Sequence, residues 1–175
     1  TGGQRCSSIQ EVLVDKEVHD EFLERAIALA RNVIQGPGAS KELAEADRTP
    51  GRFSCPPLAS EEQLERLGRL VHESVEKGAR VIYQAKVPRK LAGEGYYFPL
   101  TFLGDVKPGC PLYSEEAFGP VAVITRVEGI REAIRIANEK TGIVACIDSR
   151  DKSATENFIE LVLRTGARVS GKLLK

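Results

Sequence analysis

The sequence lacks the composition and the patterns of several classes of protein. Its 25 basic residues balance its 25 acidic residues, and a chain without net charge is not expected to bind nucleic acid or an anionic membrane by electrostatic attraction. No apolar run approaches the ~18 residues of a membrane-spanning helix. Because only two histidines occur, we expect no zinc site and predict no metal ion. The remaining composition, 42% hydrophobic and 29% charged, is that of an ordinary globular domain.

The four cysteines also lack a pattern. They show neither a CxxC motif nor the paired spacing of a disulfide framework. No signal or transit pattern opens the chain. We therefore expect reduced thiols in the cytoplasm or an organelle matrix, and not a secreted protein.

Methionine is absent altogether, so Thr1 is not a retained translation start. The 175 residues are the length of one domain with a sizeable core. A nucleophile is normally held by packed neighbours on both sides, yet the most reactive-looking cysteine, Cys6, lies almost at the first residue. We expect residues 1–175 to be a single domain of a longer polypeptide.

Apolar periodicity and turn residues divide the chain into strands and helices. We predict strands over residues 8–14, 80–83, 97–103, 121–127, 143–147 and 167–169, and helices over residues 16–32, 60–77, 129–139 and 153–164. The strand over 143–147 is expected to be buried, and the glycine- and proline-rich segment up to residue 59 to be a loose connection. This alternation is typical of an α/β fold on a mainly parallel sheet.

The helix over residues 60–77 begins at a capping box, with Ser60 at the N-cap and Gln63 at N3. Its inward stripe is expected to consist of Leu64, Leu67, Val71 and Val75. His72 borders this stripe, which predicts a packed structural histidine. His19 lies in the first turn of the preceding helix, where we expect it to be solvated.

Cys6 is the main candidate for chemistry. It follows two glycines and Gln4, and it precedes the first predicted strand, so a tight turn can hold its sulfur clear of the backbone. A free cysteine has a pKa near ~8.5, and a nucleophilic one needs a group that favours the thiolate; Arg5 is a candidate. The alternative is a buried cysteine that acts as a small apolar residue.

Several blocks of sequence resemble the aldehyde dehydrogenase superfamily, in its order. Residues 3–8, GQRCSS, are similar to the active-site signature of that family, and residues 115–121, EEAFGPV, to a second signature. Residues 95–101, GYYFPLT, resemble the approach strand between them. Residues 132–138 and the pair 150–151 match a later helix and the end of a strand. The resemblance implies a three-layer αβα catalytic domain with a mainly parallel sheet.

The resemblance also implies a reaction. The Cys6 thiolate would attack an aldehyde carbonyl, giving a thiohemiacetal, and hydride transfer to NAD or NADP would give a thioester that water hydrolyses. Glu116 would hold the nicotinamide ribose, Phe118 would lie against the nicotinamide ring or ribose, and Gln63 would reach the cofactor ribose. From the residues alone, Glu116 is equally a surface glutamate in a turn, Phe118 a core aromatic and Gln63 a helix cap.

Parts of the family pattern do not occur in these residues. The general-base glutamate, the oxyanion-hole asparagine and the cofactor-binding domain all precede the cysteine in the family. Gly171 replaces a later asparagine, and Pro56 replaces a glycine. The isolated chain is therefore expected to be inactive. The resemblance implies that the full-length protein is a homo-oligomer that binds an aldehyde.

Two alternatives remain open. One is a non-catalytic relative that keeps the fold as a structural or regulatory domain. The other is a thiol hydrolase or acyltransferase in which Cys6 works with His19 or His72.

Overall fold

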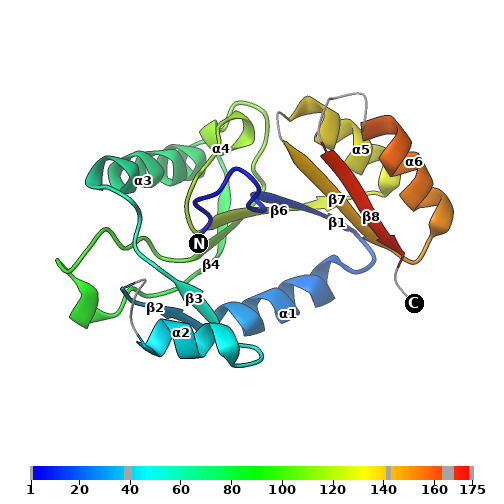
Figure 1. Ribbon diagram of the computed structural model, residues 1–175. Helices are drawn as coiled ribbons and strands as arrows, with labels where there is room; N and C mark the ends of the chain where they lie inside the picture. Colours follow the sequence, from blue (N-terminus) through cyan, green and yellow to red (C-terminus); the bar gives the residue numbers. More distant parts are fainter. Residues whose placement is uncertain (1, 38–40, 141–142, 163–167, 174–175) are drawn as a thin grey trace.

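The computed structural model describes residues 2–37, 41–140, 143–162 and 168–173, in which helices and strands alternate (Figure 1). The elements are β1 (Glu11–Asp15), α1 (His19–Ala30), β2 (Val33–Gln35), α2 (Lys41–Arg48), β3 (Phe53–Cys55), α3 (Glu61–Glu76), β4 (Arg80–Gln84), the 3-10 turn η1 (Arg89–Leu91), β5 (Thr101–Gly104), α4 (Pro111–Ser114), β6 (Val121–Val127), α5 (Ile130–Glu139), β7 (Val144–Ser149), α6 (Lys152–Val162) and β8 (Arg168–Leu173).

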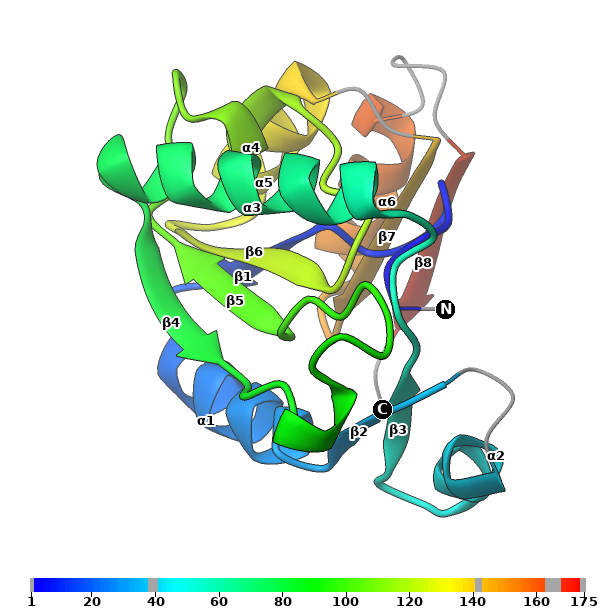
Figure 2. The same ribbon diagram turned by 90° about the vertical axis from the view of Figure 1, so that its left-hand side faces the viewer.

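The central sheet has the order β1-β6-β5-β4, in which β1, β6 and β5 are parallel and β4 is antiparallel to β5. Two smaller parallel sheets pair β2 with β3 and β7 with β8. Helices α3 and α4 cover one face of the central sheet and α1 lies on the other, while α5 and α6 lie beside β7 and β8 (Figures 1 and 2). The predicted α/β fold with a mainly parallel sheet between helices is confirmed.

The main core lies between α3 and α4 and the central sheet. Leu67 on α3 and Leu103 on β5 are completely buried, and Val121 and Val123 of β6 pack in the same cluster. A strand covered on both faces is apolar along most of its length, and β6 is buried at positions pointing to both faces. The central strand is therefore fixed by burial on both sides.

The register of the central sheet brings two distant parts of the sequence together. Glu11 of β1 pairs with Val123 of β6, and the two strands run in the same direction. The segment that precedes β1 contains Cys6, and the segment that precedes β6 contains Glu116 and Phe118. Both segments therefore meet at the amino-terminal end of the sheet.

Helix α3 follows the sequence prediction at both ends. The Ser60 side chain accepts a hydrogen bond from the backbone N–H of Gln63 at 3.2 Å, and Gly78, with a φ of 100°, ends the helix. One inward position was wrong, because Val75 is 39% exposed whereas Ser74 is fully buried. The Ser74 hydroxyl accepts from the N–H of Leu112, at 3.2 Å, so this buried polar group joins α3 to α4.

Both histidine predictions were wrong. His19 is buried, and its Nδ1 lies 2.9 Å from an Asp20 carboxylate oxygen, which lowers the pKa of Asp20 mainly through that hydrogen bond. The His72 side chain is 73% exposed and pairs with Glu76 on its own helix. Periodicity assigned each ring to a helix face but did not determine which part of that face the sheet covers.

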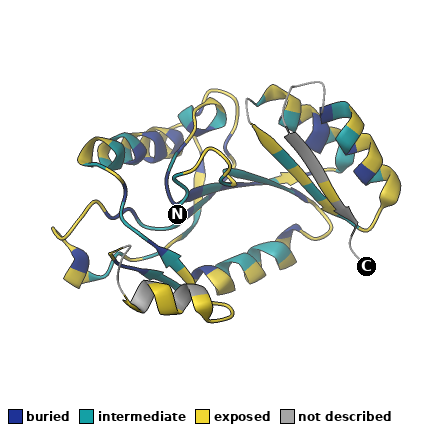
Figure 3. Cartoon of the chain, in the orientation of Figure 1, coloured by how far each residue is buried: buried dark blue, intermediate teal, exposed yellow. Residues whose placement is uncertain are grey.

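Two further predictions need correction. The segment before residue 59, expected to be loose, contains β2, α2 and β3. The strand β7, expected to be buried, alternates between exposed and half-buried residues, with Val144 43% exposed (Figure 3). Its half-buried residues face α6, and its other face is open. The end predicted for the helix over residues 153–164 lies outside the described residues.

Candidate active site

The turn before Cys6 depends on two glycines. Gly2 and Gly3 have φ values of +58° and +77°, in the left-handed region that side chains disfavour. A Cβ on Gly3 would lie 2.0 Å from the carbonyl oxygen of Gly119. The nucleophile segment therefore packs directly, backbone against backbone, on the segment before β6. Cys6 itself is exposed, as a reactive thiol needs to be.

Gln4 fixes the cysteine segment to the start of α3. Its Nε2 donates to the carbonyl of Pro57 at 3.0 Å, and its Oε1 accepts from the N–H of Ala59 at 2.9 Å. Beyond it, the N–H of Ser8 donates to the carbonyl of Arg5 at 2.9 Å and closes a turn around Cys6. The thiol thus lies on a short turn anchored on its amino-terminal side.

Gln10 fixes the other side of the cysteine segment. Its Oε1 accepts from the N–H of Ala117 at 3.0 Å, and its Nε2 donates to a carboxylate oxygen of Glu116 at 3.2 Å. Its main-chain carbonyl accepts from the N–H of Val123 at 2.8 Å. One residue thus contacts the second segment through its side chain and β6 through its backbone.

Gln63 and Arg66 hold the second segment from α3. The Gln63 Nε2 donates to the carbonyls of Ala117 and Phe118, at 3.0 Å and 2.9 Å. Arg66 donates to the carbonyl of Glu116 at 3.0 Å and pairs with Glu115 at 3.4 Å. The capping prediction for Gln63 therefore holds for its backbone N–H, whereas its side chain organises residues 117 and 118.

Gln4, Gln10 and Gln63 together form what we call the glutamine ring. Gln4 joins the cysteine segment to the start of α3, Gln63 joins α3 to residues 117–118, and Gln10 joins those residues back to the cysteine segment. Each of the three segments is thereby bonded to the other two. The ring gives the site a rigid frame made of neutral amides.

The backbone at Phe118 is strained. Its φ of +52° lies in the left-handed region, which costs an L-residue about 1–2 kcal/mol. The next residue, Gly119, packs so closely on α3 that a Cβ there would lie 2.4 Å from Leu67 Cδ2. Strain of this kind persists only where surrounding contacts fix the chain, and it concentrates at functional sites. Phe118 is half-buried and Glu116 is exposed, so both can meet a ligand.

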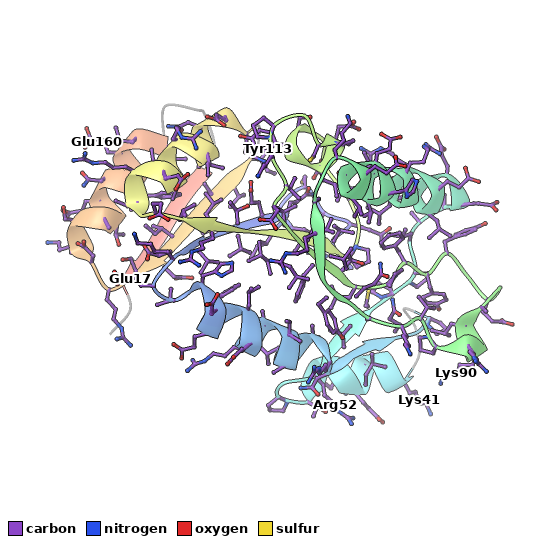
Figure 4. The ribbon with its side chains drawn as sticks, turned by 180° about the vertical axis from the view of Figure 1, so that it is seen from behind. Glu17, Lys41, Arg52, Lys90, Tyr113 and Glu160 are labelled. Carbon is purple, nitrogen blue, oxygen red and sulfur yellow. The ribbon has the colours of Figure 1, made fainter. Side chains whose placement is uncertain are left out.

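A second polar network supports α4, which leads into this segment. Lys140 lies 3.2 Å from Glu11 on β1, donates to the carbonyl of Tyr113 at 2.7 Å and lies 3.5 Å from the centre of the Tyr113 ring. The Tyr113 hydroxyl donates to Glu139, and this bond, with burial, raises the pKa of Tyr113 to about 12. Figure 4 shows Tyr113 between α4 and α5. The network links the strand after Cys6 to the helix before Glu116.

The structure does not favour the hydrolase alternative. His19 follows the carboxyl end of β1, the end opposite to Cys6, and it is engaged with Asp20. His72 is exposed on α3 and paired with Glu76. Cys55 and Cys110 are buried, and burial raises the pKa of the Cys55 thiol. Of the two exposed cysteines, Cys6 lies on the turn between Gln4 and Gln10, and Cys146 lies on β7.

Some features lie apart from this arrangement. A hollow of about 630 Å³ lies between the first turn of α3 and residues 93–96, and none of the four predicted site residues lines it. Within the described ranges, no group of three histidine, cysteine or acidic side chains could hold a metal ion. In those ranges, too, no helix combines the length and the apolar character needed to cross a bilayer.

The sequence analysis missed Gln10 and Arg66. Gln10 is an ordinary polar residue before a strand, and its partner Glu116 lies 106 positions away. Arg66 lies on the face of α3 that looks solvent-exposed by periodicity. Neither contact carries a local signal, so the pairing of β1 with β6 and the docking of α3 were needed to find them.

Known proteins are similar to this chain in both sequence and fold. The family model described as "Aldehyde dehydrogenase family" matches residues 1–168. The salicylaldehyde dehydrogenase of Pseudomonas sp. (strain C18) is 29% identical over 150 residues, which are 85% of this chain and 28% of that protein. The lactaldehyde dehydrogenase of Escherichia coli (strain K12) is 32% identical over 139 residues, 78% of this chain and 26% of that protein.

Solved structures extend the likeness of fold. Betaine aldehyde dehydrogenase from Staphylococcus aureus in complex with NAD⁺ superposes with a TM-score of 0.82 at 20% identity, over 97% of this chain and 32% of that one. An aldehyde dehydrogenase from Bartonella henselae gives a TM-score of 0.78 at 25% identity, over 97% of this chain and 33% of that one. The chain spans about a third or less of the length of these relatives.

Proposed function

Because the chain belongs to the aldehyde dehydrogenase family, we propose that the complete protein oxidises an aldehyde to a carboxylic acid with NAD or NADP, and that this chain supplies the nucleophile. The observation that carries the proposal is the contact between the two signature segments. Gly3 packs on Gly119, and Gln10 bonds to Glu116 and Ala117. The thiol and the carboxylate thus lie on adjoining segments of one site.

Cys6 has the central role in this reaction. Its thiolate forms a bond to the carbonyl carbon of the aldehyde, and a backbone N–H beside the cysteine can donate to the oxyanion that develops. Loss of hydride from that carbon leaves a thioester on the Cys6 sulfur. Water then attacks the thioester carbon, the carbon–sulfur bond breaks, and the carboxylic acid and the thiol are released. The base that activates this water is expected to lie outside residues 1–175.

Glu116 and Phe118 fit part of a site for a nicotinamide nucleotide, which when bound supplies the acceptor for the hydride. An ionised carboxylate has about four acceptor positions; Gln10 uses one at Glu116, and the others are suited to ribose hydroxyls. The half-buried Phe118 offers an apolar surface for a ring. Gln63 uses its Nε2 on two carbonyls, so a direct contact with the cofactor would fall to its Oε1.

We propose an aldehyde as the class of substrate, without choosing one aldehyde. The relatives are named for salicylaldehyde, lactaldehyde, malonate semialdehyde and succinate semialdehyde, and solved neighbours contain NAD⁺ or NADP⁺. These four aldehydes and two cofactors are the probes we would use first. We further propose a homo-oligomer located in the cytoplasm or an organelle matrix.

The test is oxidation of these aldehydes by the full-length protein, followed through the absorbance of the reduced cofactor. We expect activity with at least one pair of aldehyde and cofactor, and its loss in Cys6→Ala. The matched control is Cys146→Ala, which removes the other exposed cysteine and is expected to keep activity. Unchanged activity in Cys6→Ala would instead support the non-catalytic alternative for this domain.

A further inference from the structure

We infer that Gln10 is a positioning residue for the Glu116 carboxylate and thereby helps to set the affinity of the protein for its nicotinamide nucleotide. The inference rests on the proposed function, in which Glu116 receives the ribose. It assigns a role to a residue outside both signature segments.

The contacts of Gln10 are directional. The main-chain carbonyl of Gln10 accepts from Val123, at 2.8 Å, which places the residue in the register of β1 with β6. The Oε1 then accepts from the N–H of Ala117 at 3.0 Å, which fixes the plane of the amide and leaves Nε2 directed at Glu116, 3.2 Å from its carboxylate oxygen. The amide therefore approaches the carboxylate in one defined orientation.

Glu116 benefits from this orientation because it is exposed. An exposed glutamate samples several rotamers, and ordering its side chain on ligand binding costs free energy. A donor that already holds one carboxylate oxygen reduces that cost and leaves the second oxygen open. Because the donor is a neutral amide, it holds the Glu116 side chain without pairing it with a cation.

The chemistry at position 10 distinguishes this role from a structural one. A glutamate at that position keeps an acceptor for the Ala117 N–H but replaces the donor facing Glu116 with a second carboxylate, which repels it. A leucine removes both bonds and adds no charge. A scaffold role predicts that Gln10→Leu is the worse variant, whereas the positioning role predicts that Gln10→Glu is the worse one for cofactor binding.

The experiment measures binding of NAD⁺, and separately NADP⁺, to the full-length protein by isothermal titration calorimetry, with thermal unfolding beside it. We expect Gln10→Glu to raise the dissociation constant about tenfold and Gln10→Leu to raise it less. In steady-state assays the KM for the cofactor should rise more than kcat falls. The control is Gln84→Glu, the same change at a glutamine on β4 bonded to Thr101, and it should bind like the wild type.

Glu116→Gln separates the two hypotheses. If it weakens cofactor binding while Gln10→Glu and Gln10→Leu bind like the wild type, the inference on Gln10 is overturned and the proposed site stands. If Glu116→Gln itself binds like the wild type, the role of Glu116 in the proposed function is overturned, and the inference with it. If Gln10→Glu does not fold, weaker cofactor binding by Gln10→Leu at an unchanged melting temperature supports the positioning role, and unchanged binding, or weaker binding with a lowered melting temperature, overturns it.

Discussion

The two segments that meet at the amino-terminal end of the sheet are held in different ways. Residues 115–119 are hydrogen-bonded to Gln10, Gln63 and Arg66, and they include Phe118, whose backbone is in the left-handed region. Residues 2–8 are held by hydrogen bonds of Gln4 to Pro57 and Ala59, among others, and by close packing of Gly3 on Gly119. The first segment is therefore fixed by many polar contacts, and the second by a glycine turn.

This difference in contacts matches the function that we propose for each segment, which is cofactor binding for residues 115–119 and nucleophilic attack for residues 2–8. A carboxylate and a ring that receive a cofactor gain from being preorganised, because fewer side chains must be ordered on binding. A thiol that forms and breaks a covalent bond needs an exposed position above a turn that cannot shift. In the proposed site, hydrogen bonds thus hold the cofactor-binding segment, residues 115–119. The nucleophile segment, residues 2–8, depends instead on glycines, which have no side chain.

The largest effect is expected from a side chain in the glycine turn. Gly3→Ala would place a Cβ 2.0 Å from the Gly119 carbonyl at a φ of +77°, so we expect a loss of unfolding free energy of roughly 3–5 kcal/mol and no measurable aldehyde oxidation. Gly51→Ala is the matched control, because Gly51 has a φ of +75° but nothing within 4 Å of its Cβ position. It should cost about 1–2 kcal/mol. Equal losses in denaturant unfolding would contradict the packing described between residues 3 and 119.

A smaller effect is expected from a substitution that removes hydrogen bonds to residues 115–119. Gln63→Leu removes two hydrogen bonds and leaves the carbonyls of Ala117 and Phe118 without their amide donor, which should cost about 1–3 kcal/mol. We also expect a higher KM for the cofactor, since residues 116–118 lose their support from α3. Ser60→Ala is the comparison, because it removes only the cap of the same helix, costs ~1 kcal/mol and should leave that KM unchanged. A normal KM in Gln63→Leu would show that Arg66 and Gln10 are sufficient.

The fold and the candidate site could be predicted from the sequence only in part. Residues 121–127 form β6 as expected, and Ser60 caps α3, because both signals are local. Two elements before residue 59 escaped prediction because β2 and β3 are only three residues long, too short for an alternating pattern. The burial of His19 and the contact of Gln10 with Glu116 depend on docking between distant elements, which local periodicity does not contain.

The smallest effect is expected from the polar network of Tyr113, Glu139 and Lys140 that supports α4. The hydrogen bond to Glu139, followed by burial, raises the pKa of Tyr113 from 10.0 to about 12. A raised tyrosine pKa stabilises the fold below the unfolded value, and that contribution is lost as the pH rises from 10.0 through about 12. Tyr113→Phe should therefore lose less stability over this range than the wild type. Parallel curves of melting temperature against pH for the two proteins would contradict the bond to Glu139.

The parallel pairing of β1 with β6 also determines when the site can form during synthesis and folding of the chain. Its two halves are 106 residues apart between Gln10 and Glu116, and contacts of such long sequence separation form late in folding. A ribosome that adds ~5–20 residues per second makes the Cys6 thiol roughly 5–20 s before the segment that frames it. During that interval the new chain carries Cys6 without the segment on which Gly3 packs in the folded protein.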